Sequence, residues 1–323
     1  MKLDEINSLS TAELLKIRLC DIDFNLKSSH LMRGINDLRS ELNMKQINFM
    51  PYIWVSDDWF SPDGAPGFAL PFYLLSKRLI KLEKEFTNRV EGSHHKEFMK
   101  LVRHETAHAM DNAYKLRRIR GRQKLFGKVS TPYPKSYLPD PQSKDYVSNL
   151  GDFYAQSHPE EDWAETFACW LNPHTNWKKS YTRGLVREKL NYVENSMINI
   201  KQKKPNKFKT LPIDCISRDT RTLEQYYKQK VKRLRLDRKP FSSKSLSILF
   251  NKNPILVKTV IKQTSKNSFI SNKLINTIQR ESEKNKFSLS TKNIFLADHA
   301  TIEKKIANVT LRYIKENRHK VIM

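Results

Sequence analysis

The chain has 323 residues, 38% of them hydrophobic, which is enough for a globular core and exceeds the usual size of one domain. Its net charge of +25 is concentrated at one end: residues 201–323 hold 30 Lys and Arg against 9 Asp and Glu, a net charge of +21, which leaves +4 for residues 1–200. The three cysteines are far apart and lack C-x-x-C spacing, so they indicate neither a disulfide framework nor a thiolate zinc site. No stretch reaches the roughly 18 apolar residues of a membrane-spanning helix.

The N-terminal residues MKLDEINSLSTAELLK place acidic side chains where a signal peptide needs an apolar stretch. Together with the cysteine usage, this predicts a cytoplasmic protein. The basic excess after residue 200 predicts that this region contacts something acidic.

The first third of the chain predicts a small sheet flanked by helices. Apolar residues at helical spacing indicate one helix over 29–45 and another over 76–88. Between them, residues 47–55 and 68–75 are rich in aromatic and aliphatic side chains and indicate two strands, although Pro51 favours an edge position or a bulge. The predicted fold class is α+β, mainly helical with a small mixed sheet.

Three more helices are predicted after residue 96, and the first two carry the polar residues that are candidates for a functional site. One is expected over 97–120, ended by Gly121. After an irregular stretch over 127–151, a capping-box spacing with proline in the first turn opens a helix over 157–172. A third helix is expected over 183–201.

The charge distribution suggests how the chain divides. We expect a globular first domain over 1–201, a linker over 202–214 that is rich in lysine and contains proline, and a basic, mostly helical region over 215–323. Helical patterns in that region lie at 221–236, 254–263, 272–283 and 301–318.

The residues His104-Glu105-Thr106-Ala107-His108 lie within the helix expected over 97–120. Because residues i and i+4 are about 40° apart around a helix, His104 and His108 point to one side and can bind a single ion. Imidazole nitrogens at this spacing suit Zn²⁺, and Glu105 can act as general base toward a water at the metal.

A catalytic zinc needs a third protein ligand, and the helix that opens at residue 157 offers the best candidates. Glu161 and Glu165 are four residues apart and therefore on one face. In zinc proteases whose third ligand is a helix glutamate, the ligand comes first and an acidic residue one turn later supports a ligand histidine. This assigns Glu161 to the metal and Glu165 to the support; the reverse assignment and His158 as a ligand stay open.

Asp111 shares the face of the two histidines and is predicted to accept a hydrogen bond from one of them, with a surface acid as the alternative. Tyr154, seven residues before Glu161, is the candidate for stabilising an oxyanion. Its competitors are Tyr133, Tyr137 and Tyr146.

Between about residues 33 and 192, several motifs resemble those of the bacterial zinc-binding metallopeptidases and, more distantly, the lethal-factor-like zincins. They are Trp59-Phe60-Ser61-Pro62-Asp63-Gly64, Pro71-Phe72-Tyr73-Leu74, Arg103-His104-Glu105, Phe153-Tyr154-Ala155-Gln156-Ser157-His158-Pro159 and Glu161-Asp162-Trp163-Ala164-Glu165-Thr166.

The resemblance implies a zincin fold of the gluzincin type and zinc as the cofactor. In the lethal-factor-like zincins, a tyrosine seven residues before the glutamate ligand assists catalysis, which implies those roles for Tyr154 and Glu161. Ala107 departs from the glycine usual in these families, but alanine is small and a better helix former.

The function predicted from these patterns is zinc-dependent hydrolysis of a peptide or protein substrate. Residues 66–74 are the candidate edge strand for an extended substrate, and the basic run over 115–124 could select acidic substrates. The alternative is a protein with a structural or inactive zinc site that binds nucleic acid, an anionic membrane or an acidic partner. Residues 228–239, with seven basic side chains to one acidic, are the strongest candidate for such binding.

Overall fold

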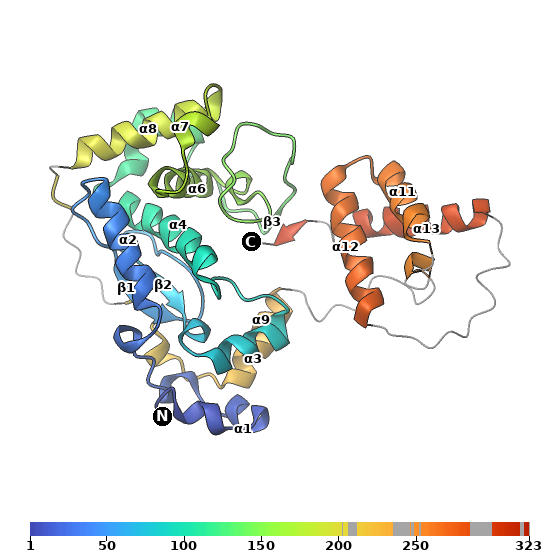
Figure 1. Ribbon diagram of the computed structural model, residues 1–323, viewed down its shortest axis with the longest axis horizontal. Helices are drawn as coiled ribbons and strands as arrows, with labels where there is room; N and C mark the ends of the chain where they lie inside the picture. Colours follow the sequence, from blue (N-terminus) through green and yellow to red (C-terminus); the bar gives the residue numbers. More distant parts are fainter. Residues whose placement is uncertain are drawn as a thin grey trace. The chain divides into compact units, whose positions relative to one another are not determined.

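The structure is a computed structural model that forms two compact units (Figure 1). The first comprises Met1–Tyr133 and Ser143–Leu236, and the second Pro134–Gln142 and Asp237–Met323. The residues that the structure describes are 1–201, 203–205, 212–234, 246, 249–251, 253–284, 299–316 and 320–322.

The first unit is mainly helical and contains a small sheet, as the sequence predicts. Strands β1 (Tyr52–Ser56) and β2 (Gly67–Pro71) pair in parallel, and Tyr52 lies opposite Gly67. A side chain at Gly67 would bring its Cβ to 2.2 Å from the Tyr52 carbonyl oxygen, so the pairing requires glycine there.

The other edge of β2 is also hydrogen-bonded. Ala69 donates its N–H to the Phe60 carbonyl at 2.8 Å in an antiparallel bridge, and the Ser61 hydroxyl donates to the Gly67 carbonyl at 2.8 Å. The bridge adds an antiparallel contact to the parallel pair. It also corrects the expectation for residues 66–74, because this strand has no free edge at Gly67 and Ala69 for a substrate peptide.

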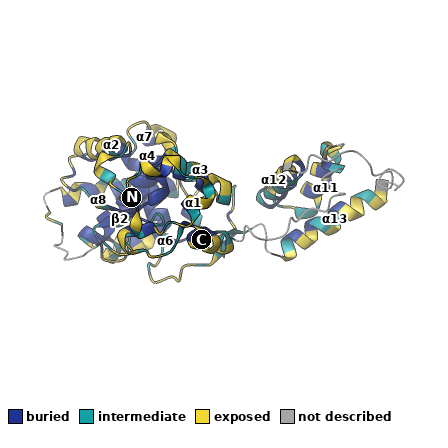
Figure 2. Cartoon of the chain, turned by 90° about the horizontal axis from the view of Figure 1, so that it is seen from below, coloured by how far each residue is buried: buried dark blue, intermediate teal, exposed yellow. Residues whose placement is uncertain are grey.

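Helix α6 (Pro159–Leu171) is central to the first unit, since every residue from Glu160 to Leu171 is buried. It packs against α4 (His95–Tyr114) and α8 (Leu185–Ile200). Figure 2 shows the buried residues concentrated in the interior of this unit. The remaining helices of the unit are α1 (Thr11–Leu15), α2 (Met32–Met44), α3 (Lys77–Thr87), α5 (Arg120–Phe126), α7 (Trp177–Ser180) and α9 (Leu223–Arg233).

Helix α4 ends earlier than the sequence predicts. Lys115 adopts a left-handed conformation with φ of 55° and ends the helix after Tyr114, and Gly121 lies inside the separate helix α5. A left-handed lysine has no sequence signal comparable to that of glycine, so the boundary could not be located from composition.

Residues 215–234, which the sequence places in the C-terminal region, pack within the first unit. Leu223, Tyr226 and Tyr227 of α9 belong to its core, and the buried Lys230 ammonium lies 2.8 Å from the Glu83 carboxylate. The backbone of this segment also bonds to the N-terminal residues, through the N–H of Leu223 and the carbonyl of Ile17 at 2.9 Å. The core therefore extends well past residue 201.

The second unit contains three described helices, α11 (Pro254–Ser265), α12 (Ser268–Lys284) and α13 (His299–Lys315), close to the three helical patterns expected there. A short antiparallel pair joins β3 (Ser136–Tyr137) to β4 (Val321–Ile322). The core of this unit includes Val257, Ile261, Leu274, Ile278, Ile306 and Tyr313.

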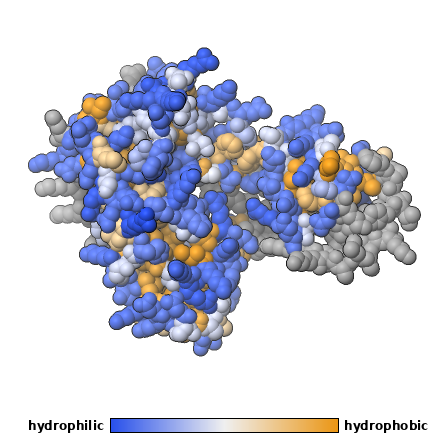
Figure 3. Space-filling model, viewed as in Figure 1, coloured by the Kyte–Doolittle hydropathy of each residue, from blue (hydrophilic) through white to orange (hydrophobic). Residues whose placement is uncertain are grey.

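No helix among the described residues combines the length and apolar character needed to cross a membrane. On the face drawn in Figure 3, hydrophilic side chains cover most of the first unit.

Candidate metal centre

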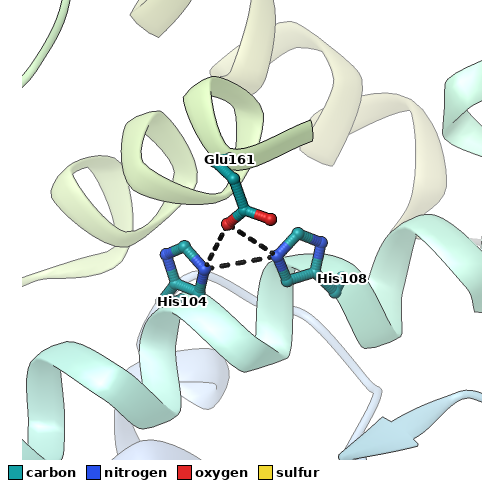
Figure 4. A group of neighbouring side chains, drawn as sticks. All are labelled: His104, His108 and Glu161. Carbon is teal, nitrogen blue, oxygen red and sulfur yellow. Dashed lines mark hydrogen bonds and ion pairs between the residues drawn. The ribbon is translucent and has the colours of Figure 1, made fainter. Parts of the chain in front are cut away.

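The side chains of His104 and His108 on α4 face Glu161 on α6 (Figure 4). The Nε2 atoms of the two histidines are 3.2 Å apart. One oxygen of Glu161, Oε2, lies 3.0 Å from His104 Nε2 and 3.5 Å from His108 Nε2. All three side chains are largely buried, with exposed fractions of 3%, 12% and 7%.

These three donor atoms fit a divalent metal ion. They lie within 4.8 Å of one another, and each side chain offers one nitrogen or oxygen. Two nitrogens bound to tetrahedral zinc at 2.0–2.1 Å would be about 3.3 Å apart, close to the separation of the two histidines. A set of two imidazoles and one carboxylate also matches the ligand preference of zinc in hydrolases.

Glu165 lies on the opposite side of the His104 ring. Its Oε1 accepts hydrogen bonds from His104 Nδ1 at 2.8 Å and from the Asn149 amide at 2.9 Å, and its Oε2 accepts from the Leu150 N–H at 2.7 Å. A proton held on Nδ1 leaves the Nε2 lone pair directed at the metal position. The structure thus places Glu161 toward the metal position and Glu165 behind the histidine.

The hydrogen bonds of Glu165 to Asn149 and Leu150 were not predicted from the sequence. Both residues lie in the irregular stretch over 127–151, where no periodic pattern indicates which side chains point inward. They tie this stretch to the same carboxylate that orients His104.

Burial and ion pairing act together on the ligand set. Burial alone would lower the pKa of His104, but its hydrogen bonds to Glu161 and Glu165 outweigh burial and raise the pKa well above the ordinary value. Burial would raise the pKa of Glu161, but His108 and His104 hold it well below its usual range. Without metal, this raised pKa favours a second proton on His104, at Nε2. A metal ion that binds Nε2 must displace this proton.

Glu105 follows His104 on α4 and is also buried, with 6% of its surface exposed. Its Oε2 has no hydrogen-bond partner among the described residues. Burial raises the pKa of this carboxyl, although His104 and His108 act in the opposite direction. A buried carboxylate with an open oxygen and a raised pKa is suited to accept and return a proton.

Two of the four candidate tyrosines lie beside the centre. The ring of Tyr154 lies 5.6 Å from that of His104, centroid to centroid. The Tyr133 hydroxyl lies 2.9 Å from Glu161 Oε1, and burial and two nearby carboxylates raise the pKa of Tyr133, so the phenol keeps its proton. Tyr146 instead covers the Lys189 ammonium at 4.4 Å, and Tyr137 belongs to β3 of the second unit.

The sequence gives no signal for the contact of Tyr133 with Glu161, because 28 residues separate them. Tyr154 follows two residues in the left-handed region, Asp152 with φ of 56° and Phe153 with φ of 57°. This conformation turns the chain into the short 3₁₀ segment Tyr154–Gln156 just before α6.

Asp111 is neither bonded to a ligand histidine in the described contacts nor a surface acid. It is fully buried, its Oδ1 accepts the backbone N–H of Arg117 at 2.6 Å, and its Oδ2 accepts from the guanidinium of Arg122. The predicted bond to a ligand histidine is absent from the described contacts of Asp111. Part of the positive charge of residues 115–124 is therefore compensated, because Arg117 and Arg122 are paired with the buried Asp111.

His158 is a helix cap and offers no free nitrogen for a metal. Its Nδ1 accepts the N–H of Glu160 at 3.2 Å, and its Nε2 donates to the Thr131 carbonyl at 2.7 Å. This explains why a histidine precedes Pro159, the first residue of α6.

The fold and the site together define a helical protein with a buried His-His-Glu centre. Residues 91–230 match the model of a family described as "Putative zinc-binding metallo-peptidase", which confirms the family resemblance predicted for this part of the chain. The matched segment includes both helices of the centre and most of α9. A search of curated proteins and a search of solved structures found no match. The likeness to lethal-factor-like zincins stays a prediction.

Proposed function

We propose that this protein is a zinc-dependent peptidase that uses Glu105 as general base. The observation that carries the proposal is the three-residue group His104, His108 and Glu161 with a buried, unpartnered carboxylate oxygen at the adjacent Glu105. Zinc sites with three protein ligands keep a position for water or substrate, whereas structural sites usually have four.

Each residue around the centre has a definite task in this reaction. When bound, zinc acts as a Lewis acid toward water and the substrate carbonyl. Glu105 accepts a proton from the attacking water and returns it to the leaving amine, for which its raised pKa is favourable. Tyr154 donates a hydrogen bond to the carbonyl oxygen as negative charge develops there. Glu165 keeps His104 in the correct tautomer.

The test is cleavage of a peptide library by purified wild type and by Glu105→Gln, with zinc content measured on both. We expect the variant to keep zinc and to lose cleavage by about 10²–10⁴-fold, because only the proton acceptor is removed. Glu85→Gln on α3 changes an exposed glutamate in the same way and should leave both quantities unchanged. Full activity of Glu105→Gln, or a zinc-loaded wild type that cleaves no peptide, would refute the proposal.

A second candidate function concerns the second unit. Lys258, Lys262 and Lys266 follow one another at four-residue spacing on or next to α11, and all three are exposed. We propose that this lysine row binds a phosphate-bearing polyanion. In the run over 228–239, by contrast, Lys230 is buried and Arg233 is paired with Asp58, and residues 235–239 lie outside the described part.

Salt-dependent retention of the full chain on DNA, RNA and anionic phospholipid vesicles tests this second proposal. Replacing the three lysines by glutamine should weaken retention and reduce its salt dependence on whichever polyanion binds. Retention that the triple variant leaves unchanged, or absence of retention on all three, would rule out the lysine row as a polyanion site.

A further inference from the structure

The two oxygens of Glu161 have different partners. Oε2 faces both ligand histidines, whereas Oε1 lies 2.9 Å from the hydroxyl of Tyr133. A hydroxyl that donates to one carboxylate oxygen leaves the other as the single atom available to a metal.

The Tyr133 hydroxyl has a second acceptor within reach, Glu160 Oε2, also at 2.9 Å. A hydroxyl has one proton to donate, so these two carboxylates compete for it. The other oxygen of Glu160 lies 3.2 Å from the guanidinium of Arg117. Glu161 likewise lies next to positively charged partners, the two ligand histidines, so replacement of Glu160 shows how strongly it competes for the Tyr133 proton.

The ring of Tyr133 is held against the start of α6. It stacks on the ring of His158 with 3.7 Å between centroids and 18° between planes. His158 is itself fixed through both nitrogens, to Glu160 at the helix start and to the Thr131 carbonyl. The tyrosine therefore keeps its place relative to the helix that carries the metal ligand.

We propose that Tyr133 is a positioning residue that holds Glu161 as a one-oxygen metal ligand, and that His158 holds Tyr133 in place. The proposal rests on the metal centre of the proposed function. It gives a role to a tyrosine that does not contact the ligand histidines in any described interaction.

The experiment compares zinc affinity and cobalt coordination in wild type, Tyr133→Phe and the control Tyr114→Phe. Tyr114 lies at the end of α4, where its ring packs against Phe49. Competition with a chelator should show zinc binding weakened by about 10–100-fold in Tyr133→Phe and unchanged in the control. Cobalt-substituted Tyr133→Phe should show weaker visible absorption, because a freed Glu161 binds through both oxygens and raises the coordination number.

Glu160→Gln separates positioning from simple loss of packing. It replaces the competing carboxylate by a weaker amide acceptor, which favours donation of the Tyr133 hydroxyl to Glu161. Zinc affinity should therefore stay within about threefold of wild type, less than 1 kcal/mol. Wild-type affinity and an unchanged cobalt spectrum in Tyr133→Phe would overturn the proposal. An equal loss of affinity in Glu160→Gln would overturn it as well.

These measurements do not depend on turnover. A wild type that binds zinc but cleaves no peptide would refute the proposed peptidase and leave the role of Tyr133 standing. A wild type that binds no zinc at this centre would refute both.

Discussion

Replacing Glu165 by glutamine changes a buried carboxylate that accepts three hydrogen bonds. Its Oε1 accepts from His104 and Asn149, and its Oε2 accepts from the Leu150 N–H. Glutamine has one acceptor oxygen and one NH₂ group, so either orientation brings its NH₂ against another donor. At least one hydrogen bond is lost, and the others lose their charge assistance.

The magnitude follows from the kind of bond that is lost. A hydrogen bond to a charged group contributes about 1.5–3 kcal/mol, and an unsatisfied buried donor costs a similar amount. We therefore expect the metal-free protein to lose about 1–3 kcal/mol of unfolding free energy. Zinc affinity should fall by about 10–100-fold, because the tautomer of His104 is no longer fixed.

Urea unfolding in the presence of a chelator measures the first quantity, and zinc competition measures the second. The matched control is Glu188→Gln on α8, where the side chain is exposed and neither quantity should change. Wild-type zinc affinity in Glu165→Gln would refute the reasoning, even if the stability decreased, because the carboxylate would then support the loop alone.

Three further predictions concern proton binding and packing. The pKa of His104 is raised well above 6.5, so neutral pH lies below this pKa. The zinc Kd should therefore increase about tenfold for each unit by which the pH is lowered around neutrality. A Kd that does not change with pH would contradict this prediction. In the wild type, the buried Lys189 ammonium lies 2.6 Å from the Asp162 carboxylate, and Asp162→Asn removes this counter-charge. We expect the free energy of unfolding in urea to fall by about 3–5 kcal/mol, and an unchanged midpoint would exclude this. Gly67→Ala forces a contact with the Tyr52 carbonyl and should cost about 1–3 kcal/mol in thermal unfolding, so wild-type stability would show that the strands can shift at no cost.

The parts of the site that follow from local periodicity could be predicted from the sequence. The four-residue spacing of His104 and His108 places them on one side of any helix, and the same holds for Glu161 and Glu165. Capping chemistry also placed the start of α6 within two residues of Pro159, although the cap is His158.

The parts that depend on chain reversals could not be predicted. Asp111 meets Arg117 and Arg122 only because Lys115 ends α4 and the chain turns back. Tyr133 reaches Glu161 only because the loop before residue 134 folds over the start of α6. In neither case does a short-range pattern carry the information.

In α9, the density of basic residues predicted an exposed segment, but one of its lysines is buried. A high density of lysine and arginine usually indicates an exposed, solvated segment. Here Lys230 is buried against Glu83, and its ammonium also lies 2.8 Å from the Tyr226 hydroxyl. The number of basic residues in this segment is high, but the charge of Lys230 lies in the interior of the first unit.

Hydrogen bonds join Ile17, Leu19 and Trp54 to residues 213–223, and they hold these segments of the first unit together. Besides the bond from Leu223 to Ile17, the N–H of Leu19 donates to the Arg221 carbonyl at 2.9 Å, and the Trp54 indole donates to the Ile213 carbonyl at 2.9 Å. A protease cut between residues 202 and 212 should therefore yield two fragments that stay associated until they are denatured. A fragment designed for crystallisation or assay should likewise extend to residue 234, because one that ends at 201 would leave the partners of these bonds behind.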